Sequence, residues 1–526
     1  MPLSHPPRGQ SPSAMTALGT LRTVSTLPQA AVAPERLPGP RGGARRPFRQ
    51  PQPQPPVRRQ LPTIRIRTRI GRRAPYLLAA LFATLYTLDS VRRYLEFRTE
   101  SWDLALFTEA VKQYAHLHAP IVDARAPGFD LLGEHFHPIL ALLAPFFAIE
   151  PSPITLLVAQ ALLFAASIVP VTSLARERVG SREGYVVGAA YGMSFGIVQA
   201  VDFDFHELAF AAPLIALALQ ALLRNQSRLL IVACIGLLCT KEEFGVTVVM
   251  PLGIAWSLHD RTAWRRRLPL AALGVAASAL QILWLIPALN PNHVYGFLTN
   301  AGATGSAGNN ENVAQLLTDP AGKLHLLFLL ALATAFTALL SPLALLAIPD
   351  LLMRFASSNT FYWGTLYHYN SVLMPILFIA AIDALARPRR HRSLPRRFKP
   401  IAISAIALAA VSMQSAYGLP QTFSQQQYAP SSLHIQALRA AIHEIPPGAT
   451  VESGISTLAP LAAKADAFWL GNTSVDPAPE YIVYDTLTAA EPLTPDQLVQ
   501  LAETWHPLAV YDLVSSQDGV DVLRMP

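Results

Sequence analysis

Long apolar runs recur along this chain and constrain its fold more than any other feature. PYLLAALFATLYTL begins at Pro75, ITLLVAQALLFAASIVPVTSLA at Ile154, and LPLAALGVAASALQILWLIPAL at Leu268. About 20 such residues cross the hydrocarbon core of a bilayer as a helix. Only 14% of the 526 residues are charged, against about 25% in an average soluble protein. The sequence therefore predicts an α-helical polytopic membrane protein.

The Arg-rich connections between these runs predict how the helices are oriented. Basic stretches lie at 176–183, 224–228, 259–267 and 387–399, and cytoplasmic loops of membrane proteins carry an excess of Lys and Arg. With the N-terminus inside, about eleven transmembrane helices place all four stretches in the cytoplasm. The joint at Ser341–Pro342 carries no charge, so the two helices around it can alternatively form one kinked element. The predicted helices are residues 75–91, 152–175, 185–200, 207–223, 228–240, 244–258, 268–289, 324–340, 342–355, 371–386 and 400–417.

The first 74 residues predict a disordered basic cytoplasmic tail. They are rich in Pro, Gln, Ser and Arg, contain a single acidic residue, Glu35, and lack the apolar bulk that a folded core requires. No short apolar segment of a signal peptide follows Met1, so the first apolar run is expected to remain as a membrane helix. The net charge of +7 does not indicate nucleic-acid binding, because the basic residues cluster in particular loops. We therefore expect a multi-pass protein of the plasma (inner) membrane.

The segment between the first two predicted spans, residues 92–151, is expected to be an outer loop with two structured parts. Apolar residues at spacings of three and four, from Leu104 to Tyr114, predict an amphipathic helix in the outer interface. The apolar stretch 138–149 is too short to span and is interrupted by proline, so we expect a re-entrant or interfacial piece there.

The chain changes character after about residue 431. LHIQALRAAIHEI and TPDQLVQLAETW have the spacing of helices, whereas ATVES, EYIVYD and LAVYDLV are typical of short strands. We therefore expect residues 75–417 to form the membrane domain and residues 431–526 a small extracytoplasmic α/β domain.

Ionisable residues gather in five motifs that the predicted topology places on the outer side of the membrane. Charged groups at membrane depth are costly, so they are candidates for function. The motifs WDLALF, GEHFH, DFDFHE, TKEE and TLYHYN come from five separate places in the chain. Together they predict one site open to both the membrane and the outside, suited to a substrate with a lipid tail and a phosphate-bearing head. Their polar residues are Asp103, Glu134, His135, His137, Asp202, Asp204, His206, Glu207, Lys241, Glu242, Glu243, Tyr367, His368 and Tyr369.

Two of these motifs offer donors for a divalent metal ion. His135 and His137 would face the same way on an extended segment, next to Glu134. In DFDFHE, the same alternation would put Asp202, Asp204 and the histidine that follows on one side. We predict that Mg or Mn binds among these residues. Alternatively, both segments are polar loops that only contact water.

Asp103 is the candidate general base or metal ligand. It lies just past the first span, where a partly desolvated carboxylate has a raised pKa. Alternatively, it is a carboxylate at the start of a helix, next to a capping Ser101.

Phosphate or sugar binding is predicted for the remaining motifs. Lys241 and Glu242 lie in a joint with no room for a soluble loop, where they either form an interfacial ion pair or help to bind phosphate. His206 is expected to act with Lys241 on the phosphate. Tyr367 and His368 would hydrogen-bond a sugar or phosphate, or they belong to an interfacial aromatic belt.

The order of these motifs also resembles a known family. WDLALF, GEHFHPILALLAPFFAIEPSP, DFHELAFAAPLIALAL, LCTKEEFG, and SPLALLAIPDLL with YHYN resemble a bacterial family of uncharacterised predicted membrane proteins, over roughly residues 75–390. That family looks distantly related to the GT-C glycosyltransferases, which use polyprenyl-phosphate sugars. GT-C enzymes place an acid in the first outer loop as catalytic base or metal-site residue, and Asp103 occupies that place. The usual second adjacent acid is absent, because Trp102 and Leu104 flank it.

The residues and the resemblance together predict a membrane glycosyltransferase. It would pass a sugar from a polyprenyl-phosphate donor to a cell-envelope glycan, lipid or protein acceptor on the outer face of the membrane. Asp103 would deprotonate the acceptor hydroxyl. The alternative is a transporter or flippase for a lipid-linked or anionic solute, although the predicted spans contain few internal charges. The third hypothesis is a non-catalytic membrane scaffold that acts through its outer domain.

Overall fold

The computed structural model describes most of the chain beyond its first 68 residues. The predicted disordered tail, residues 1–74, lies outside the described residues except for 69–74, which begin the first helix. The described residues are 69–99, 101–259, 262–296, 313–387, 397–418, 430–473 and 478–526.

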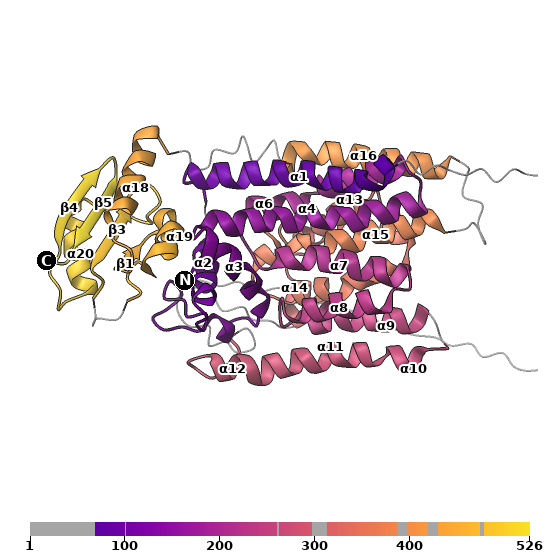
Figure 1. Ribbon diagram of the computed structural model, residues 1–526, viewed down its shortest axis with the longest axis horizontal. Helices are drawn as coiled ribbons and strands as arrows, with labels where there is room; N and C mark the ends of the chain where they lie inside the picture. The colour runs from indigo at the N-terminus through magenta and orange to yellow at the C-terminus, as the bar shows by residue number, and fades with distance from the viewer. Residues whose placement is uncertain are drawn as a thin grey trace, which may run out of the picture. The chain divides into compact units, whose positions relative to one another are not determined.

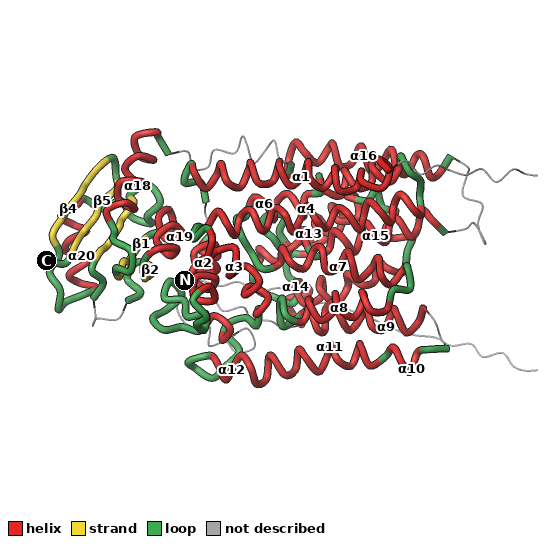
Figure 2. Tube along the Cα trace, viewed as in Figure 1, coloured by secondary structure: helices red, strands yellow, loops and turns green. Residues whose placement is uncertain are grey.

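Apolar helices lying side by side make up the larger part of the described chain (Figures 1 and 2). This agrees with the predicted helical class. Six helical segments are long and apolar enough to cross a membrane: Arg73–Leu95, Pro153–Arg178, Glu183–Asp202, Trp264–Leu289, Tyr369–Ala386 and Phe398–Tyr417. Shorter apolar segments are Pro138–Ile149, Leu208–Leu223, Ser227–Leu238, Gly245–His259 and Pro320–Ala333.

The individual helices of this part are α1 (Arg69–Leu95), α4 (Pro153–Arg178), α5 (Glu183–Gly192), α6 (Phe195–Asp202), α7 (Leu208–Leu223), α8 (Ser227–Leu238), α9 (Met250–His259), α10 (Trp264–Arg267), α11 (Pro269–Leu280), α12 (Ile286–Leu289), α13 (Pro320–Ala333), α14 (Ile348–Phe355), α15 (Leu373–Ala386) and α16 (Phe398–Tyr417). Some of the apolar segments consist of more than one helix: Glu183–Asp202 contains α5 and α6, and Trp264–Leu289 contains α10, α11 and α12.

Two predicted helices differ from the observed ones. The helix expected over 324–340 ends at Ala333, because Ala335 and Phe336 adopt left-handed backbone angles that a helix cannot continue through. The helix expected over 342–355 begins as a 3-10 turn, Pro342–Ala347, and becomes α-helical only in α14. Each of these described segments is therefore shorter than a bilayer-spanning α-helix.

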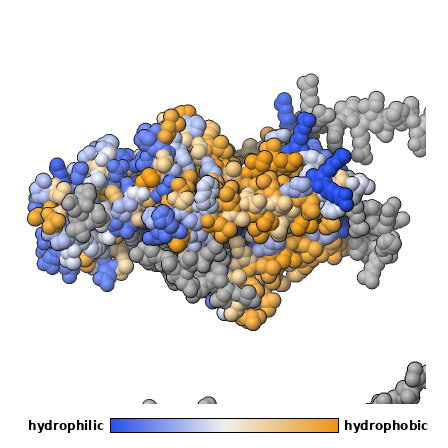
Figure 3. Space-filling view, turned by 90° about the horizontal axis from the view of Figure 1, so that it is seen from below, coloured by the Kyte–Doolittle hydropathy of each residue, from blue (hydrophilic) through white to orange (hydrophobic). Residues whose placement is uncertain are grey.

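The surface of the helical part is apolar in the way a lipid-facing surface requires. Leu77, Leu81 and Leu88 project from α1 and are all more than half exposed. Leu283 and Trp284 project in the same manner between α11 and α12. In Figure 3, apolar side chains cover the surface over the helices, whereas the α/β domain is mostly hydrophilic. An exposed apolar belt of this kind fits a protein surrounded by lipid.

The predicted outer loop contains α2 (Trp102–Ala115) and α3 (Ala144–Ile149). The interfacial position expected for the first of these helices stays a prediction, although this helix exposes no polar face over most of its length. Every residue from Leu104 to Val111 is buried, and α19 of the terminal domain packs against α2. Residues 138–149 form a 3-10 turn, Pro138–Leu143, followed by α3, so this apolar stretch is broken as well as short.

The terminal domain is an α/β sandwich around a five-stranded sheet. The sheet order is β2-β1-β3-β5-β4, in which β2, β1 and β3 are parallel and β5 and β4 are antiparallel. The predicted strand LAVYDLV is wrong in its bounds, because β4 begins only at Asp512; α19, β2 and β5 were not predicted. The elements are α18 (Ser432–Glu444), β1 (Thr450–Ser453), α19 (Ile455–Lys464), β2 (Asp466–Trp469), β3 (Tyr481–Asp485), α20 (Pro495–Trp505), β4 (Asp512–Gln517) and β5 (Val520–Arg524).

Candidate functional site

Three side chains from distant parts of the sequence meet where α2, the α6–α7 turn and the 356–370 loop come together. Asp103, His206 and His368 each offer one ligand atom, and these atoms all lie within 4.8 Å of one another. The imidazole rings of His206 and His368 are stacked, with 3.5 Å between their centroids. Both histidines are buried, and Asp103 is half-buried.

The turn that carries His206 is held by hydrogen bonds to two other elements. The backbone N–H of His206 donates to Gln160 Oε1 of α4 over 3.0 Å. Asp204, which has a left-handed φ of 77°, accepts a hydrogen bond of 3.0 Å from the N–H of Ser101. Because Ser101 directly precedes α2, the same turn also positions the start of the helix that bears Asp103.

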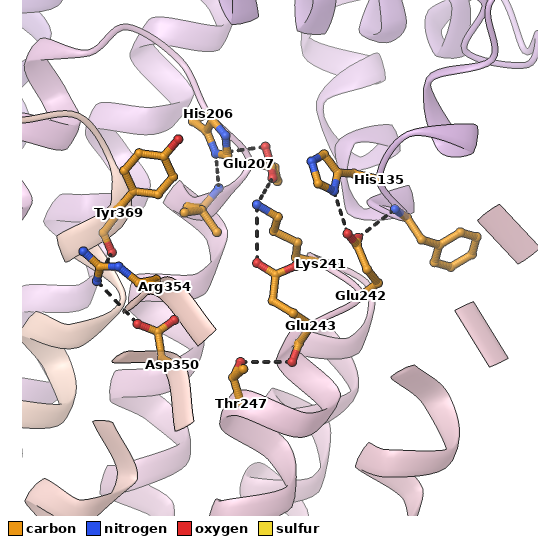
Figure 4. A network of polar contacts seen from close by, with 12 residues as sticks. His135, His206, Glu207, Lys241, Glu242, Glu243, Thr247, Asp350, Arg354 and Tyr369 are labelled. Carbon is orange, nitrogen blue, oxygen red and sulfur yellow. Dashed lines mark hydrogen bonds and ion pairs between the residues drawn. The ribbon is translucent and has the colours of Figure 1, made fainter. Parts of the chain in front are cut away.

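A buried arginine holds the loop that carries His368. Arg354 Nε donates to the carbonyl oxygen of Tyr362 (2.6 Å), and Nη2 donates to Asn370 Oδ1 (2.8 Å). Arg354 Nη1 also lies 3.4 Å from Asp350 Oδ2, as Figure 4 shows. Neither Arg354 nor Asp350 was predicted as a site residue, although an acid and an arginine four residues apart in an apolar stretch were a visible signal.

Lys241 lies buried between two carboxylates close to this group (Figure 4). Its Nζ is 3.4 Å from Glu243 Oε1 and 3.9 Å from Glu207 Oε1. Burial alone would lower the pKa of Lys241, but Glu243 and then Glu207 raise it well above its ordinary value. Lys241 therefore carries its positive charge at neutral pH.

Glu242 holds the GEHFH segment and does not face the three-residue group. Its carboxylate lies 2.6 Å from His135 Nδ1 and accepts hydrogen bonds from Phe136 N (3.1 Å) and Tyr295 Oη (2.8 Å). Burial favours the neutral acid, yet the charge of His135 and its hydrogen bond bring the pKa of Glu242 down to about 2. Glu242 is thus an ionised anchor.

The two histidines of GEHFH do not face the same way. His135 turns to Glu242, whereas His137 is buried with its ring 5.7 Å from that of Phe107. Burial lowers the pKa of His137 to about 4, so it is neutral. Glu134 pairs with Arg125 over 2.9 Å. The expected alternation fails here because each side chain is held by a different neighbour.

The expected alternation in DFDFHE fails as well. Asp202 is the last residue of α6 and pairs with Arg93 of α1, whereas Asp204 turns to the N–H of Ser101. The left-handed backbone at Asp204 reverses the direction in which the side chains point. Neither aspartate belongs to the group formed by Asp103, His206 and His368.

The remaining predicted residue, Tyr367, packs among aromatic rings. Its ring lies 4.8 Å from that of Phe203 and 5.1 Å from that of Phe361, both edge-on. Tyr367 also has a left-handed φ of 65°, which places it on the turn directly before His368.

The surroundings of Asp103 bring the pKa of its carboxyl group close to neutral pH. The Ser101 side chain makes no capping hydrogen bond, but Asp103 does lie in the first turn of α2, as the helix-start alternative expects. Burial, and then the negative charges of Glu207 and Glu134, raise the pKa of Asp103 to about 7, while Lys241 acts in the opposite direction. A carboxylate with this pKa can accept a proton under physiological conditions.

The donor set suits a divalent transition-metal ion better than Mg²⁺. Burial lowers the pKa of both His206 and His368 well below the ordinary value, so both imidazoles are neutral, as metal ligands must be. Neither ring nitrogen of His368 has a hydrogen-bond partner among the described residues. Two imidazoles and one carboxylate are typical ligands of transition metals, whereas Mg²⁺ prefers oxygen. The five residues predicted to bind metal lie outside this group.

Solved structures with a similar fold include a membrane protein bound to a lipid phosphate. The crystal structure of ArnT from Cupriavidus metallidurans bound to undecaprenyl phosphate matches with a TM-score of 0.53 and 15% sequence identity, over 87% of this chain and 98% of that one. At this identity the likeness shows the fold alone. No curated protein matches the chain.

Comparison with family models gives a match over most of the chain. The model of DUF2079, described as "Predicted membrane protein", matches residues 93–522, which include the outer loop, the helical part and the α/β domain. This confirms the resemblance to a family of predicted membrane proteins and extends it to the terminal domain. The chain belongs to the DUF2079 family of predicted membrane proteins.

Proposed function

We propose that this protein is a membrane glycosyltransferase that takes a sugar from a polyprenyl-phosphate donor. In this proposal, about eleven helical segments cross the plasma (inner) membrane, with the N-terminus in the cytoplasm. The α/β domain and the site then lie outside the cytoplasm, where the acceptor is a glycan, lipid or protein of the cell envelope. The Arg-rich connections support this orientation.

The observation that carries the proposal is the meeting of Asp103, His206 and His368 beside the buried Lys241. Sugar transfer from a phosphate needs a base for the incoming hydroxyl and positive charge for the departing phosphate. The carboxylate of Asp103 and the ammonium group of Lys241 can meet these two needs. The pKa of Asp103, about 7, lies near the optimum for a general base.

The fold supports the class of donor. ArnT, whose fold this chain shares, was crystallised with undecaprenyl phosphate, which is a polyprenyl phosphate. Lys241 is the group in the described site best suited to bind a phosphate of this kind, because Glu207 and Glu243 keep it charged. A bound phosphate would compete with these two carboxylates for the ammonium group.

A metal ion would have a defined place in this site. Asp103, His206 and His368 would hold it, and when bound it would supply positive charge close to the phosphate. Asp103 serves either as the base or as a ligand of the ion, and the two roles differ in their response to a chelator. A base without a metal leaves turnover insensitive to EDTA, whereas a ligand makes it sensitive and restorable by Mn²⁺.

The test is transfer of labelled sugar from undecaprenyl-phosphate sugars by the purified full chain in proteoliposomes. The wild type and Asp103→Asn are compared with Asp496→Asn, an exposed acid at the start of α20 that serves as a matched control. We expect Asp103→Asn to lower turnover by about 100-fold or more, with the control at wild-type level. Equal turnover by Asp103→Asn overturns the role of Asp103. Flux of the lipid-linked substrate without any product would replace the proposal by the flippase alternative.

A further inference from the structure

The loop after β2 joins the terminal domain to the outer loop that carries the site. β2 ends at Trp469, and its ring lies edge-on to that of Trp102, with 6.1 Å between centroids. Trp102 directly precedes Asp103. Asn472 Nδ2 donates a 2.9 Å hydrogen bond to the carbonyl oxygen of Arg125. The end of β2 and the loop after it therefore contact the first residue of α2 and the segment that follows this helix.

A buried carboxylate of the α/β domain holds this loop in place. Glu452 of β1 is fully buried, and its oxygens accept hydrogen bonds from Gly471 N (3.0 Å), Thr473 N (3.1 Å) and the Thr473 hydroxyl. His506, at the end of α20, places its Nε2 3.3 Å from the same carboxylate. The two loop residues that Glu452 binds flank Asn472, so the carboxylate fixes the backbone that presents the Asn472 amide.

Arg125 connects the loop to residues next to the candidate site. Its carbonyl oxygen is bound by Asn472, and its guanidinium pairs with Glu134 over 2.9 Å. The same guanidinium lies over the rings of Trp102 (5.5 Å) and Phe129 (5.3 Å). Arg125 thus contacts both the residue before Asp103 and an acid whose charge acts on Asp103.

A second attachment holds helix α2 itself and does not involve the loop after β2. Lys112 of α2 donates a 2.7 Å hydrogen bond to the carbonyl oxygen of Ala465, and α19 packs on α2. These contacts dock the domain without touching Arg125 or Glu134. The bond from Asn472 therefore adds a separate constraint on the 120–134 segment.

We propose that the α/β domain positions the Asp103–Glu134 side of the candidate site through the Gly471–Thr473 loop, with Glu452 and Asn472 as positioning residues. The α/β domain then supports the segments that carry the site and is not an independent module. The catalytic consequence rests on the proposed glycosyl transfer, but the positioning itself is a property of the fold and can be measured without activity.

The test compares hydrogen exchange and turnover in four full-length proteins. Asn472→Asp keeps the size of the side chain but replaces the donor by a carboxylate that repels the Arg125 carbonyl. Glu452→Gln weakens the anchor of the loop. Glu503→Gln, an exposed acid on α20, is the matched control beside the wild type. Loss of one such hydrogen bond should speed exchange of the amides in 120–135 by about three- to tenfold.

We expect this increase in Asn472→Asp and Glu452→Gln, with α18 and α20 unchanged and the control at wild-type level. In the transfer assay, kcat should fall in both variants while the KM for the polyprenyl-phosphate donor stays the same, because Lys241 is not disturbed. Unchanged exchange of 120–135 in Asn472→Asp overturns the proposal, whatever the assay gives. Should Glu452→Gln unfold the domain, Asn472→Asp still decides. Faster exchange in a chain whose wild type transfers no sugar keeps the positioning and refutes only the proposed function.

Discussion

His434 of the α/β domain and His368 of the candidate site, both buried, differ in how their ring nitrogens are bonded. In the domain, His434 Nε2 lies 3.2 Å from Asp485, and its Nδ1 lies 2.6 Å from the carbonyl oxygen of Asp518. In the site, His368 has no hydrogen-bond partner for either ring nitrogen among the described residues and stacks on His206 instead. Buried polar atoms are nearly always paired in proteins. The difference indicates that His434 helps to maintain the fold of the domain, whereas the ring nitrogens of His368 are available to a ligand.

Replacing Lys241 should cause the largest loss of stability, because its ammonium group lies between two carboxylates of the site. Lys241→Met leaves Glu207 and Glu243 buried without their partner and should cost about 3–5 kcal/mol of stability. Thermal unfolding in detergent measures the loss. Lys241→Arg, which keeps the charge, should stay close to wild type. Adding Glu243→Gln to Lys241→Met should recover part of the loss; no recovery would mean that the ammonium group acts on something other than these carboxylates.

Replacing one histidine in each region tests the comparison directly. His434→Phe leaves the buried Asp485 without this partner, so the variant should be destabilised by about 1–3 kcal/mol. His368→Phe removes nitrogens that bind no described side chain, so its stability should stay within about 1 kcal/mol of wild type. In addition, Mn²⁺ should raise the melting temperature of the wild type but not that of His368→Phe, if the ion binds at the three-residue group. Equal destabilisation by the two replacements would abolish the distinction drawn between the regions.

Glu109 should have a smaller effect, which appears as a pH dependence of the free energy of unfolding. It is buried in α2, and one carboxylate oxygen, Oε1, has no hydrogen-bond partner among the described residues. Burial raises its pKa from an ordinary 4.5 to about 8. Between these values the folded protein keeps a proton that the unfolded chain loses, so the free energy of unfolding falls as the pH rises.

Glu109→Gln should remove this pH dependence. The variant should unfold at about the same temperature as the wild type near pH 5 and at a higher temperature at pH 8, because the amide has no proton to lose. Melting curves across this pH range provide the measurement, with Glu503→Gln as an exposed control. A stability difference that stays constant with pH would show that Glu109 is ionised in the folded protein.

Several features of the fold could be predicted because they depend on local sequence. The span Pro153–Arg178 was recognisable since its length and apolarity are properties of one segment. The helix expected over 324–340 failed because two left-handed residues, Ala335 and Phe336, end it without a Gly or Pro to announce the break. In the α/β domain, β5 was missed since VDVLR is short and becomes a strand only by pairing with β3 and β4.

The sequence by itself determined that the protein is helical and apolar enough for a membrane, and that acids, histidines and one lysine recur in a few short motifs. Hydrophobic length and residue type are encoded along the chain, so no partner is needed to recognise them. Only the tertiary structure decided which motifs share a site. Asp103, His206 and His368 meet, whereas Asp202 turns to Arg93 and Glu242 to His135. The physical reason is that a buried charge is stabilised by an opposite charge close in space, and for Asp202 and Glu242 that partner lies more than 100 residues away in the sequence.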